Sequence, residues 1–426
     1  MRNKVFTTEA AASSLGYLQV NVNNRQNNFP VSDASIQISY KGDPLSTVEQ
    51  LTTNSSGQTE RIQLAAPPYE YSLSPGEVQP YSEYNIMINA PGFKEAMISG
   101  SEILADVTAV QPVLLEPVAD NQTEENPIVI PDHTLYGNYP PKIAEAEVKP
   151  MNESGEIVLS RVVVPETVIV HDGAPTDTSA ANYYLPYRDY IKNVASSEIY
   201  ATWPESSITA NVLAIMSFTL NRVYTEWYRN QGHIFTITSS TAFDHKFIYG
   251  RNIYENISVI VDSIFDNYLS RPEVKQPILT QYCDGHQVEC LSRGWMTQWG
   301  SCELGEKGYT PIQIIRHFYG DDMYINTAEE IAGIPSSWPG YNLTVGASGD
   351  KVRQVQDQLA TIAKIYAAIP RITTDGVFGA NTADAVRAFQ SVFGLPQTGV
   401  IDFATWYKIS QLYVAVTGIA ELNPRM

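Results

Sequence analysis

The chain has 426 residues, enough for about three domains that each bury a core of their own. Its composition, 43% hydrophobic and 17% charged, is typical of a globular protein. The net charge of −19 argues against a nucleic-acid partner, whose phosphates attract clustered lysine and arginine, and against simple electrostatic attraction to an anionic wall polymer. No apolar run reaches the about 18 residues of a membrane-spanning helix, so we predict no membrane span.

Residues 1–14 are a predicted N-terminal leader with a basic start but without the apolar run of a signal peptide. We therefore expect synthesis in the cytosol of the producing cell. The chain has three cysteines, and this odd number does not predict a disulfide framework.

Residues 15–117 have the pattern of an all-β domain. Leu18, Val20 and Val22 alternate with polar residues, as strands with one buried face do. Similar alternation or turn residues recur at 30–40, 54–57 and 86–92. The pattern resembles the carboxypeptidase regulatory-like, prealbumin-type β-sandwich, an accessory module of many secreted proteins. The resemblance leaves open whether the module binds, inhibits or only folds.

Residues 118–161 are a predicted extended linker. Its first part is acidic and polar, and Pro140, Pro141 and Pro150 follow. A protease is expected to cut most easily in such a segment.

Residues 162–340 mix strand and helix patterns and form a predicted central α+β domain. Strands are expected at 162–170, 234–238 and 277–282, and helices at 257–269 and 311–319.

A long helix is also predicted in this domain. Thr202 is its expected N-cap, Pro204 lies in its first turn, and Glu205 closes a capping box. Apolar residues at 208–223 recur every three or four positions, the period of a helix with one buried face. Glu198 has no structural role in this pattern. It precedes the helix, where we expect a loop that presents its side chain to a cleft.

Residues 344–416 are a predicted small all-α domain. Helices are expected at 351–366 and 381–393, with a third from 402 onward. Gly376 and Gly379 permit a sharp turn between helices. The domain resembles the peptidoglycan-binding domain type 1, with its Asp-Gly-x-Phe-Gly turn, its Phe-Gln pair at 389–390 and Trp406. The resemblance implies the wall glycan and its stem peptide as partner.

About residues 160–325 resemble the SpoIID (stage II sporulation protein D) family of lytic transglycosylases. In that family a glutamate precedes a Trp-Pro pair and a long Ala/Val-rich helix, as Glu198 precedes Trp203 and Pro204 here. A second family block, roughly Gly-Met-Ser-Gln-Tyr-Gly, is similar to Gly-Trp-Met-Thr-Gln-Trp-Gly at 294–300, with one extra tryptophan.

The resemblance implies that Glu198 is the catalytic acid. It would protonate the glycosidic oxygen between muramic acid and glucosamine, and its carboxylate would then accept the proton of the muramoyl 6-hydroxyl. That hydroxyl attacks C1 and closes a 1,6-anhydro ring, so one carboxylate suffices where an ordinary glycosidase uses two. Ile199, Tyr200 and Trp203 are expected to raise the pKa of Glu198 by desolvation. On the residue alone, a surface glutamate ahead of a helix is the alternative interpretation.

Further substrate contacts are expected from Tyr200, Trp203, Asp244, His245, Tyr282 and Gln298. The pair at 244–245 falls where the family usually carries a polar pair, and the last two residues are equally explained by packing or by satisfied hydrogen bonds. The chain also departs from the family, whose helix commonly carries Lys, Gln and Arg where Thr209, Asn211 and Met216 stand here. This departure leaves the substrate contacts open.

The order of the domains resembles the family of spore cortex-lytic enzymes. The resemblance implies a zymogen that is made in the mother cell without a signal peptide and stored in the dormant spore outside the cortex. A subtilisin-like germination protease would remove a pro-region of about 160 residues, and the product would degrade cortex peptidoglycan. We place the processing site between Pro140 and Val164, where the linker meets the first strand of the central domain.

Two other classes of function stay open. The first is a zinc-dependent amidase that cuts muramoyl from L-alanine through a metal-bound water. Candidate ligands of a zinc site are Cys283, His286, Cys290 and Cys302. For the catalytic zinc of an amidase, the obvious histidines are His171, His245 and His286. The cysteine spacing matches no standard zinc finger, so we predict no metal and no cofactor. The second is a non-catalytic wall-binding or spore-coat scaffold.

Overall fold

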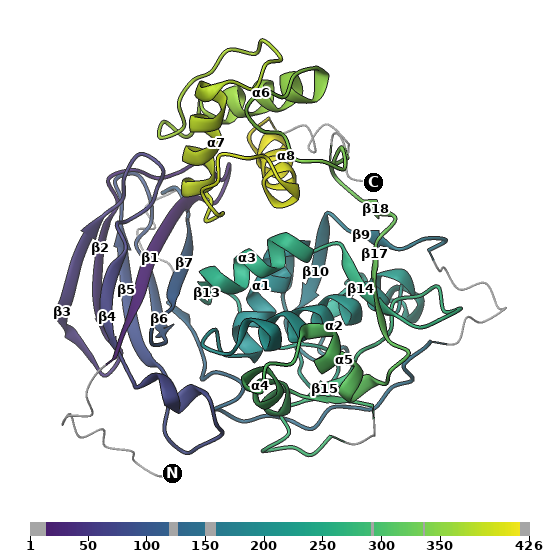
Figure 1. Cartoon of the computed structure of the whole chain (residues 1–426). Coiled ribbons are helices and arrows are strands. Elements are labelled where there is room, and N and C mark those ends of the chain that lie inside the picture. Colours follow the sequence, from purple (N-terminus) through teal and green to yellow (C-terminus); the bar gives the residue numbers. More distant parts are fainter. Residues whose placement is uncertain (1–13, 119–126, 150–158, 291–293, 335–336, 418–426) are drawn as a thin grey trace.

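The computed structural model describes residues 14–118, 127–149, 159–290, 294–334 and 337–417 (Figure 1). Strands dominate the N-terminal region, helices and short strands mix in the central region, and the C-terminal region is helical. The predicted leader lies outside the described residues except for Ser14, and so do the parts 119–126 and 150–158 of the predicted linker.

The N-terminal region contains two β-sheets that pack against each other through β1, β4 and β6. Its strands are β1 (Ser14–Asn24), β2 (Ser35–Tyr40), β3 (Asp43–Thr52), β4 (Ile62–Ala66), β5 (Ser82–Asn89), β6 (Ala96–Ile103) and β7 (Thr108–Leu115), with a short 3-10 helix η1 (Tyr69–Ser72). Leu18, Val20 and Val22 of β1 are buried, which confirms the predicted alternation. Ile36 and Ile38 of β2 are buried in the same way.

Two short strands from later in the chain extend these sheets. β8 (Ile128–Val129) pairs with β6, and β13 (Ile253–Tyr254) of the central region pairs with β7. The strand orders are therefore β13-β7-β1-β4 and β3-β2-β5-β6-β8. The N-terminal and central regions share a sheet through β13.

The central region is built around one helix, α2. Its helices are α1 (Tyr187–Glu198), α2 (Glu205–Tyr224), α3 (Glu255–Ile264), α4 (Gln298–Glu306) and α5 (Pro311–Tyr319), with a short 3-10 helix η2 (Arg229–Gln231). Its further strands are β9 (Val163–Val164), β10 (Thr167–His171), β11 (Asn182–Pro186), β12 (Ile237–Thr238), β14 (Asn267–Ser270), β15 (Tyr282–Cys283), β16 (Met296–Thr297), β17 (Tyr324–Thr327) and β18 (Glu330–Ile331). α2 contacts the other four of these α-helices as well as β9 and β14.

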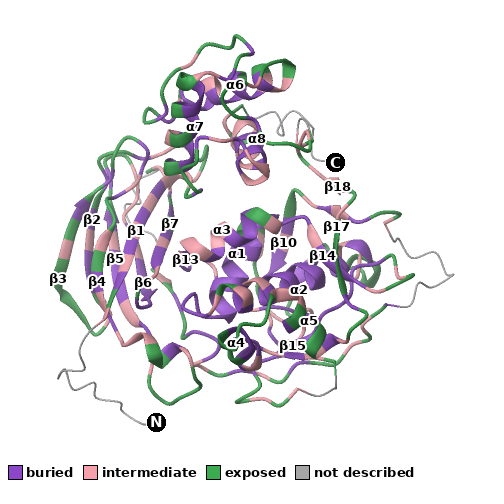
Figure 2. Cartoon of the chain, in the orientation of Figure 1, coloured by how far each residue is buried: buried purple, intermediate pink, exposed green. Residues whose placement is uncertain are grey.

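The predicted capping box at the start of α2 is wrong. The N-cap is Pro204, which has no side-chain capping hydrogen bond. The Thr202 hydroxyl instead donates to Ser72 Oγ of the N-terminal region at 2.7 Å. The prediction of a single buried face is also wrong, because α2 is buried on nearly all sides (Figure 2). Its polar residues are satisfied internally, as when Asn211 Nδ2 donates to the Ser207 carbonyl oxygen and to Ser301 Oγ.

The remaining predictions for this region fare unevenly. The helix predicted at 311–319 is confirmed as α5, whereas the helix predicted at 257–269 ends at Ile264. The strand β14 follows it and pairs with β17. This pairing explains why the last residues of the predicted helix form a strand, although their apolar spacing is typical of a helix. Helices α1 and α4 were not predicted from the sequence.

Residues 127–149, which we call the strap, lie within the predicted linker but are packed against the central region. After β8 the strap has no helix or strand. Pro140 and Pro141 keep its backbone extended, because proline fixes φ and disfavours helix at the preceding residue. Ile130, Tyr139 and Lys142 are nevertheless buried.

The C-terminal region confirms the predicted helical pattern. Its helices are α6 (Asp350–Ile362), α7 (Ala380–Val392) and α8 (Phe403–Thr417). Gly376 has a φ of +77°, and its N–H donates to Gln356 Oε1 of α6 at 2.8 Å. The turn therefore requires glycine for its backbone conformation. None of the helices in the described residues is long and apolar enough to cross a membrane.

Candidate functional site around Glu198

Glu198 is the last residue of α1, whereas the sequence led us to expect a loop. The helix ends here because Ile199 adopts an extended conformation, with φ −136° and ψ 155°. Glu198 is fully buried, with none of its surface exposed. The candidate acid therefore lies on a fixed helix end inside the central region.

Both carboxylate oxygens of Glu198 accept hydrogen bonds. The backbone N–H of Lys246 donates to Oε1 at 2.6 Å, and the hydroxyl of Tyr282 donates to Oε2. Burial raises the pKa of Glu198, while the charge of Lys142 and the bonds from Tyr282 and Lys246 act in the opposite direction. A raised pKa keeps more of the protonated form near neutral pH, as a general acid needs.

Tyr282 links Glu198 to the strap. It belongs to β15, is buried, and lies with its ring 4.4 Å from Nζ of Lys142. Burial, and next the negative charge of Glu198, raise its pKa well above the usual value. The phenol therefore stays protonated and donates to the carboxylate.

His245 is buried next to Glu198 and Tyr282. Its ring stacks on Tyr282 with centroids 5.9 Å apart, and the Tyr190 hydroxyl lies 3.0 Å from its Nδ1. Burial lowers its pKa well below the usual value, so the imidazole is neutral. Nε2 has no hydrogen-bond partner within the described parts of the chain.

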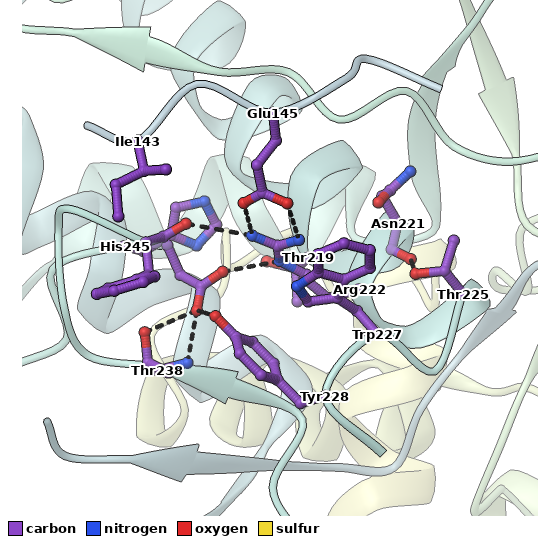
Figure 3. Close-up of polar contacts among 12 residues, drawn as sticks. Ile143, Glu145, Thr219, Asn221, Arg222, Thr225, Trp227, Tyr228, Thr238 and His245 are labelled. Carbon is purple, nitrogen blue, oxygen red and sulfur yellow. Dashed lines mark hydrogen bonds and ion pairs between the residues drawn. The ribbon is translucent and has the colours of Figure 1, made fainter. Parts of the chain in front are cut away.

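Both carboxylate oxygens of Asp244 accept hydrogen bonds from protein groups, and Figure 3 labels their partners Arg222, Tyr228 and Thr238. Its Oδ1 accepts from Arg222 Nε at 2.8 Å. Its Oδ2 accepts from the Tyr228 hydroxyl at 2.7 Å and from the backbone N–H and hydroxyl of Thr238 at 2.9 and 2.7 Å. With its oxygens bound in this way, Asp244 orients Arg222 in this structure.

Gln298 fixes the backbone at Glu198. It is the first residue of α4, and its Nε2 donates to the carbonyl oxygen of Glu198 at 3.0 Å. The structure thus brings Glu198, Asp244, His245, Tyr282 and Gln298 together, and their roles in catalysis and substrate binding stay predictions.

Tyr200 and Trp203 lie elsewhere, against the N-terminal region. His133 of the strap stacks on Tyr200 with centroids 4.4 Å apart. Trp203 Nε1 donates to the carbonyl oxygen of Ser72 at 2.8 Å. Both rings also contact Trp299, so they form a buried aromatic cluster.

The strap contributes site residues that the sequence reasoning missed. Lys142 Nζ donates to the carbonyl oxygen of Asp244 at 2.6 Å. The Thr134 hydroxyl donates to the carbonyl oxygen of Ser197, next to Glu198. Burial lowers the pKa of Lys142, while Glu198 and Asp244 raise it. The alternation of residues 142–149 would not have revealed these strap residues, because its charged residues face inward: Lys142 and Lys149 are buried, whereas Ile143 and Val148 are exposed.

The cysteines contradict the zinc interpretation. Cys283 and Cys290 form a disulfide, so neither offers a thiolate. The odd number of cysteines gave no indication of this single bridge. Cys302 is a buried free thiol, and His286 is exposed. Within the described residues, no group of three or more His, Cys, Asp or Glu side chains is placed to hold a metal ion.

Comparison with known proteins bears mainly on the C-terminal region. Residues 348–409 match the family model of the peptidoglycan binding domain. Over 76 residues the chain is 41% identical to the zinc D-Ala-D-Ala carboxypeptidase of Streptomyces albus G. The matched stretch is 18% of this chain and 28% of that relative. The chain therefore carries a peptidoglycan-binding domain and spans less than a third of this relative's length.

Among solved structures, the SleB N-terminal domain is 31% identical, with a TM-score of 0.16, over 18% of this chain and 99% of its own. The 5-hydroxyisourate hydrolase of Klebsiella pneumoniae is 18% identical, with a TM-score of 0.17, over 24% of this chain and 92% of its own. Scores this low carry no argument about the fold. The peptidoglycan-binding domain indicates peptidoglycan as the partner and a function related to the cell wall.

Proposed function

We propose that the chain is the zymogen of a lytic transglycosylase that degrades spore cortex peptidoglycan in germination. It would be a SpoIID-like enzyme of the SleC type, with a prealbumin-like N-terminal sandwich and Glu198 as its acid. The matched peptidoglycan-binding domain supports the substrate class. The proposal includes storage outside the cortex, synthesis in the mother cell and activation by a subtilisin-like germination protease.

One observation carries the proposed chemistry. Glu198 is a buried carboxylic acid with a raised pKa, and it accepts hydrogen bonds from the Tyr282 hydroxyl and the Lys246 N–H. The neighbouring carboxylate, Asp244, is bound by Arg222 and Tyr228. Because Asp244 forms an ion pair with Arg222, we assign both proton transfers to Glu198. A mechanism with a single carboxylate fits a reaction in which the sugar supplies its own nucleophile.

The proposed reaction has two proton transfers. Glu198 gives its proton to the glycosidic oxygen as the bond from that oxygen to muramoyl C1 breaks, and glucosamine leaves with a free hydroxyl. The carboxylate then takes the proton of the muramoyl 6-hydroxyl while the oxygen of that hydroxyl bonds to C1. The Tyr282 hydroxyl and the Lys246 N–H stabilise the carboxylate between these steps. No water is consumed, and Glu198 ends protonated again.

The burial of Glu198 supports a zymogen. With no exposed surface, its carboxyl group is out of reach of a glycan in the full chain. The strap packs next to it: the Thr134 hydroxyl bonds to the carbonyl oxygen of the preceding residue, Ser197, and Lys142 lies against the Tyr282 ring. We infer that activation moves the strap. Processing between Pro140 and Val164 is the simplest route, and it stays a prediction.

The test is mass spectrometry of muropeptides released from decoated spores. We would place specific protease sites within 119–126 and within 150–158, purify the full chain, and cut it after folding. Anhydro-muramic ends that are released by the cut chain and lost in its Glu198→Gln variant would support the proposal. Reducing ends would point to a hydrolase instead, and free stem peptides to an amidase. A folded, cut chain that releases nothing would point to a binding scaffold.

A further inference from the structure

Arg222 binds a carboxylate that comes from the strap (Figure 3). Glu145 approaches the guanidinium group with both oxygens: Nη2 donates to Oε1 at 2.6 Å, and Nη1 donates to Oε2 at 3.0 Å. This paired geometry matches the two parallel N–H donors of arginine to the two oxygens of a carboxylate. The Arg222 side chain has no exposed surface.

The rest of the site holds Arg222 in place without the strap. Nε donates to Asp244 at 2.8 Å, and Nη2 also donates to the carbonyl oxygen of Phe243 at 3.2 Å. The rings of Trp227 and Tyr228 lie 5.2 and 5.5 Å from the guanidinium carbon. If the strap leaves, Arg222 keeps this orientation but loses the acceptors that Glu145 provides. The two Nη groups then point, in a fixed orientation, at the place that the Glu145 carboxylate has left, and this arrangement favours a replacement carboxylate.

This carboxylate site lies beside Glu198. Asp244 holds Arg222, and Lys246, two positions later, donates to Glu198. Two residues of extended chain span at most about 7 Å, so the backbone positions that hold the two sites lie close together. The strap contacts both, through Glu145 at Arg222 and through Lys142 at the Tyr282 ring. A muramic acid placed at Glu198 carries a peptide arm, and every such arm ends in a carboxylate unless it is amidated.

We propose that Arg222 is the binding subsite for the carboxylate of the muramic acid's peptide arm, and that Glu145 occupies it in the full chain as an internal stand-in. The inference rests on the proposed function for the identity of the ligand. It gives the chain a cation for its substrate, although Thr209, Asn211 and Met216 stand where the resembling family carries Lys, Gln and Arg. In a chain with a net charge of −19, an anionic ligand needs such a local positive group.

The first experiment is rescue of the uncut full chain by a small carboxylate. Lys149 of the strap also pairs with Glu145, so Glu145→Ala is combined with Lys149→Ala. The double variant removes the stand-in and leaves Arg222 as the cation of a vacant site. Propionate is expected to raise the melting temperature of this variant by about 2 °C or more, and propionamide is not. The matched control is Glu147→Ala, which removes the strap carboxylate that pairs with the partly exposed Arg271. Equal responses of the two variants, or equal effects of propionate and propionamide, would overturn the carboxylate site.

The second experiment identifies the ligand class with the cut chain. N-acetylmuramoyl-L-alanine is expected to bind at least about tenfold tighter than its C-terminal amide by calorimetry, the difference made by about one charged hydrogen bond. Arg222→Lys keeps the charge but loses the paired donors, so it should remove the preference. Equal affinities for the acid and the amide would overturn the peptide-arm assignment. This readout needs no turnover, so a chain that prefers the acid but releases no anhydro ends would sink only the proposed function.

Discussion

Glu198 shows how the neighbours of one carboxyl group set its chemistry. Burial favours its neutral form, while Lys142, Tyr282 and the Lys246 N–H favour its charged form. Two of these neighbours belong to the central region and stay in place when the strap leaves. The Tyr282 hydroxyl is therefore a group whose removal should be measurable in the activated protein.

Tyr282→Phe should move the pH profile of the cut chain. The lost hydrogen bond stabilises the carboxylate, so the pKa of Glu198 rises. A general acid loses activity as pH rises through its pKa, so the alkaline limb of kcat/KM should shift to higher pH. At the wild-type optimum, kcat should fall about tenfold, the loss expected for one hydrogen bond to a charged group.

The matched control for that variant is Tyr319→Phe. Tyr319 is also buried, but its hydroxyl donates to the carbonyl oxygen of Gln281 rather than to Glu198. Its alkaline limb should stay where it is. An unchanged limb in Tyr282→Phe would mean that Glu198 is not the titrating acid.

Asp244→Asn should destabilise the full chain strongly. The substitution removes the charge that pairs with the fully buried Nε of Arg222. Arg222 keeps its pair with Glu145, so the expected cost is that of a lost hydrogen bond to a charged group, about 1.5–3 kcal/mol in the free energy of unfolding. Urea unfolding followed by tryptophan fluorescence would measure it. Glu226→Gln, which breaks an ion pair with the exposed Arg229, should cost less than about 1 kcal/mol, and a similar cost for both would refute this account.

The sequence singled out candidate residues of the central region that lie together in the structure, but it gave no sign of their contacts with the strap. Glu198 and Gln298 were identified because short motifs surround them. Lys142 and Glu145 were missed because they lie in a polar, proline-containing stretch, and their partners Asp244 and Arg222 are 102 and 77 positions away. Local composition carries no information about such long-range pairs.

At the scale of elements, the strap behaves like a strand held by side chains. The amide of Gln281 accepts from the Glu145 N–H at 2.9 Å and donates to the Ile143 carbonyl oxygen at 2.8 Å. Gln276 makes the same two bonds to the backbone of Lys149. These amides add to two backbone bonds, from the Ile143 N–H to the Ala242 carbonyl oxygen and from the Leu279 N–H to the Glu147 carbonyl oxygen.

Gln281→Ala should loosen the middle of the strap. Two hydrogen bonds to its backbone are lost, each worth about 1 kcal/mol. Hydrogen exchange of the Glu145 amide in the full chain should accelerate about tenfold or more, while amides of β1 keep their rates. Gln231→Ala is the control, because its Nε2 bonds to Trp227 on the surface. Unchanged exchange at Glu145 would show that the carboxylate contacts alone hold the strap.

The errors at α2 also arise at this scale. Its apolar period predicted a helix correctly, but Ser207, Asn211 and Asn221 look like solvent-facing positions in the sequence. Their side chains are buried because neighbouring elements provide hydrogen-bond partners, as Pro277 does for Asn221. A period read from one segment cannot include these partners.

At the scale of the whole molecule, a buried ion pair joins the N-terminal and central regions. Glu102 of β6 pairs with Arg251, and both side chains are almost completely buried. Asn252 and the Tyr254 hydroxyl donate to the Glu102 carbonyl oxygen, next to the shared strand β13. Burial raises the pKa of Glu102 to about 7, although Arg251 acts against it.

The raised pKa of Glu102 predicts a pH dependence of stability. A carboxyl group whose pKa is higher in the folded chain contributes stability below its usual value of 4.5, and this contribution is lost as pH rises through about 7. Glu102→Gln does not titrate. Its melting temperature should therefore fall less than that of the wild type between about pH 5 and pH 8. Parallel curves for the two proteins would contradict the assignment.

The shared sheet has a consequence for what proteolysis can achieve. Ile253 and Tyr254 of β13 pair with Val110 and Ala109 of β7, and a cut in the intervening chain breaks none of these hydrogen bonds. After such a cut, the two pieces are separate polypeptides but still one particle. Release of the N-terminal piece is then a dissociation equilibrium, set by concentration and time as well as by the protease. A nicked preparation should run as two bands under denaturing electrophoresis and elute as a single species from a gel-filtration column.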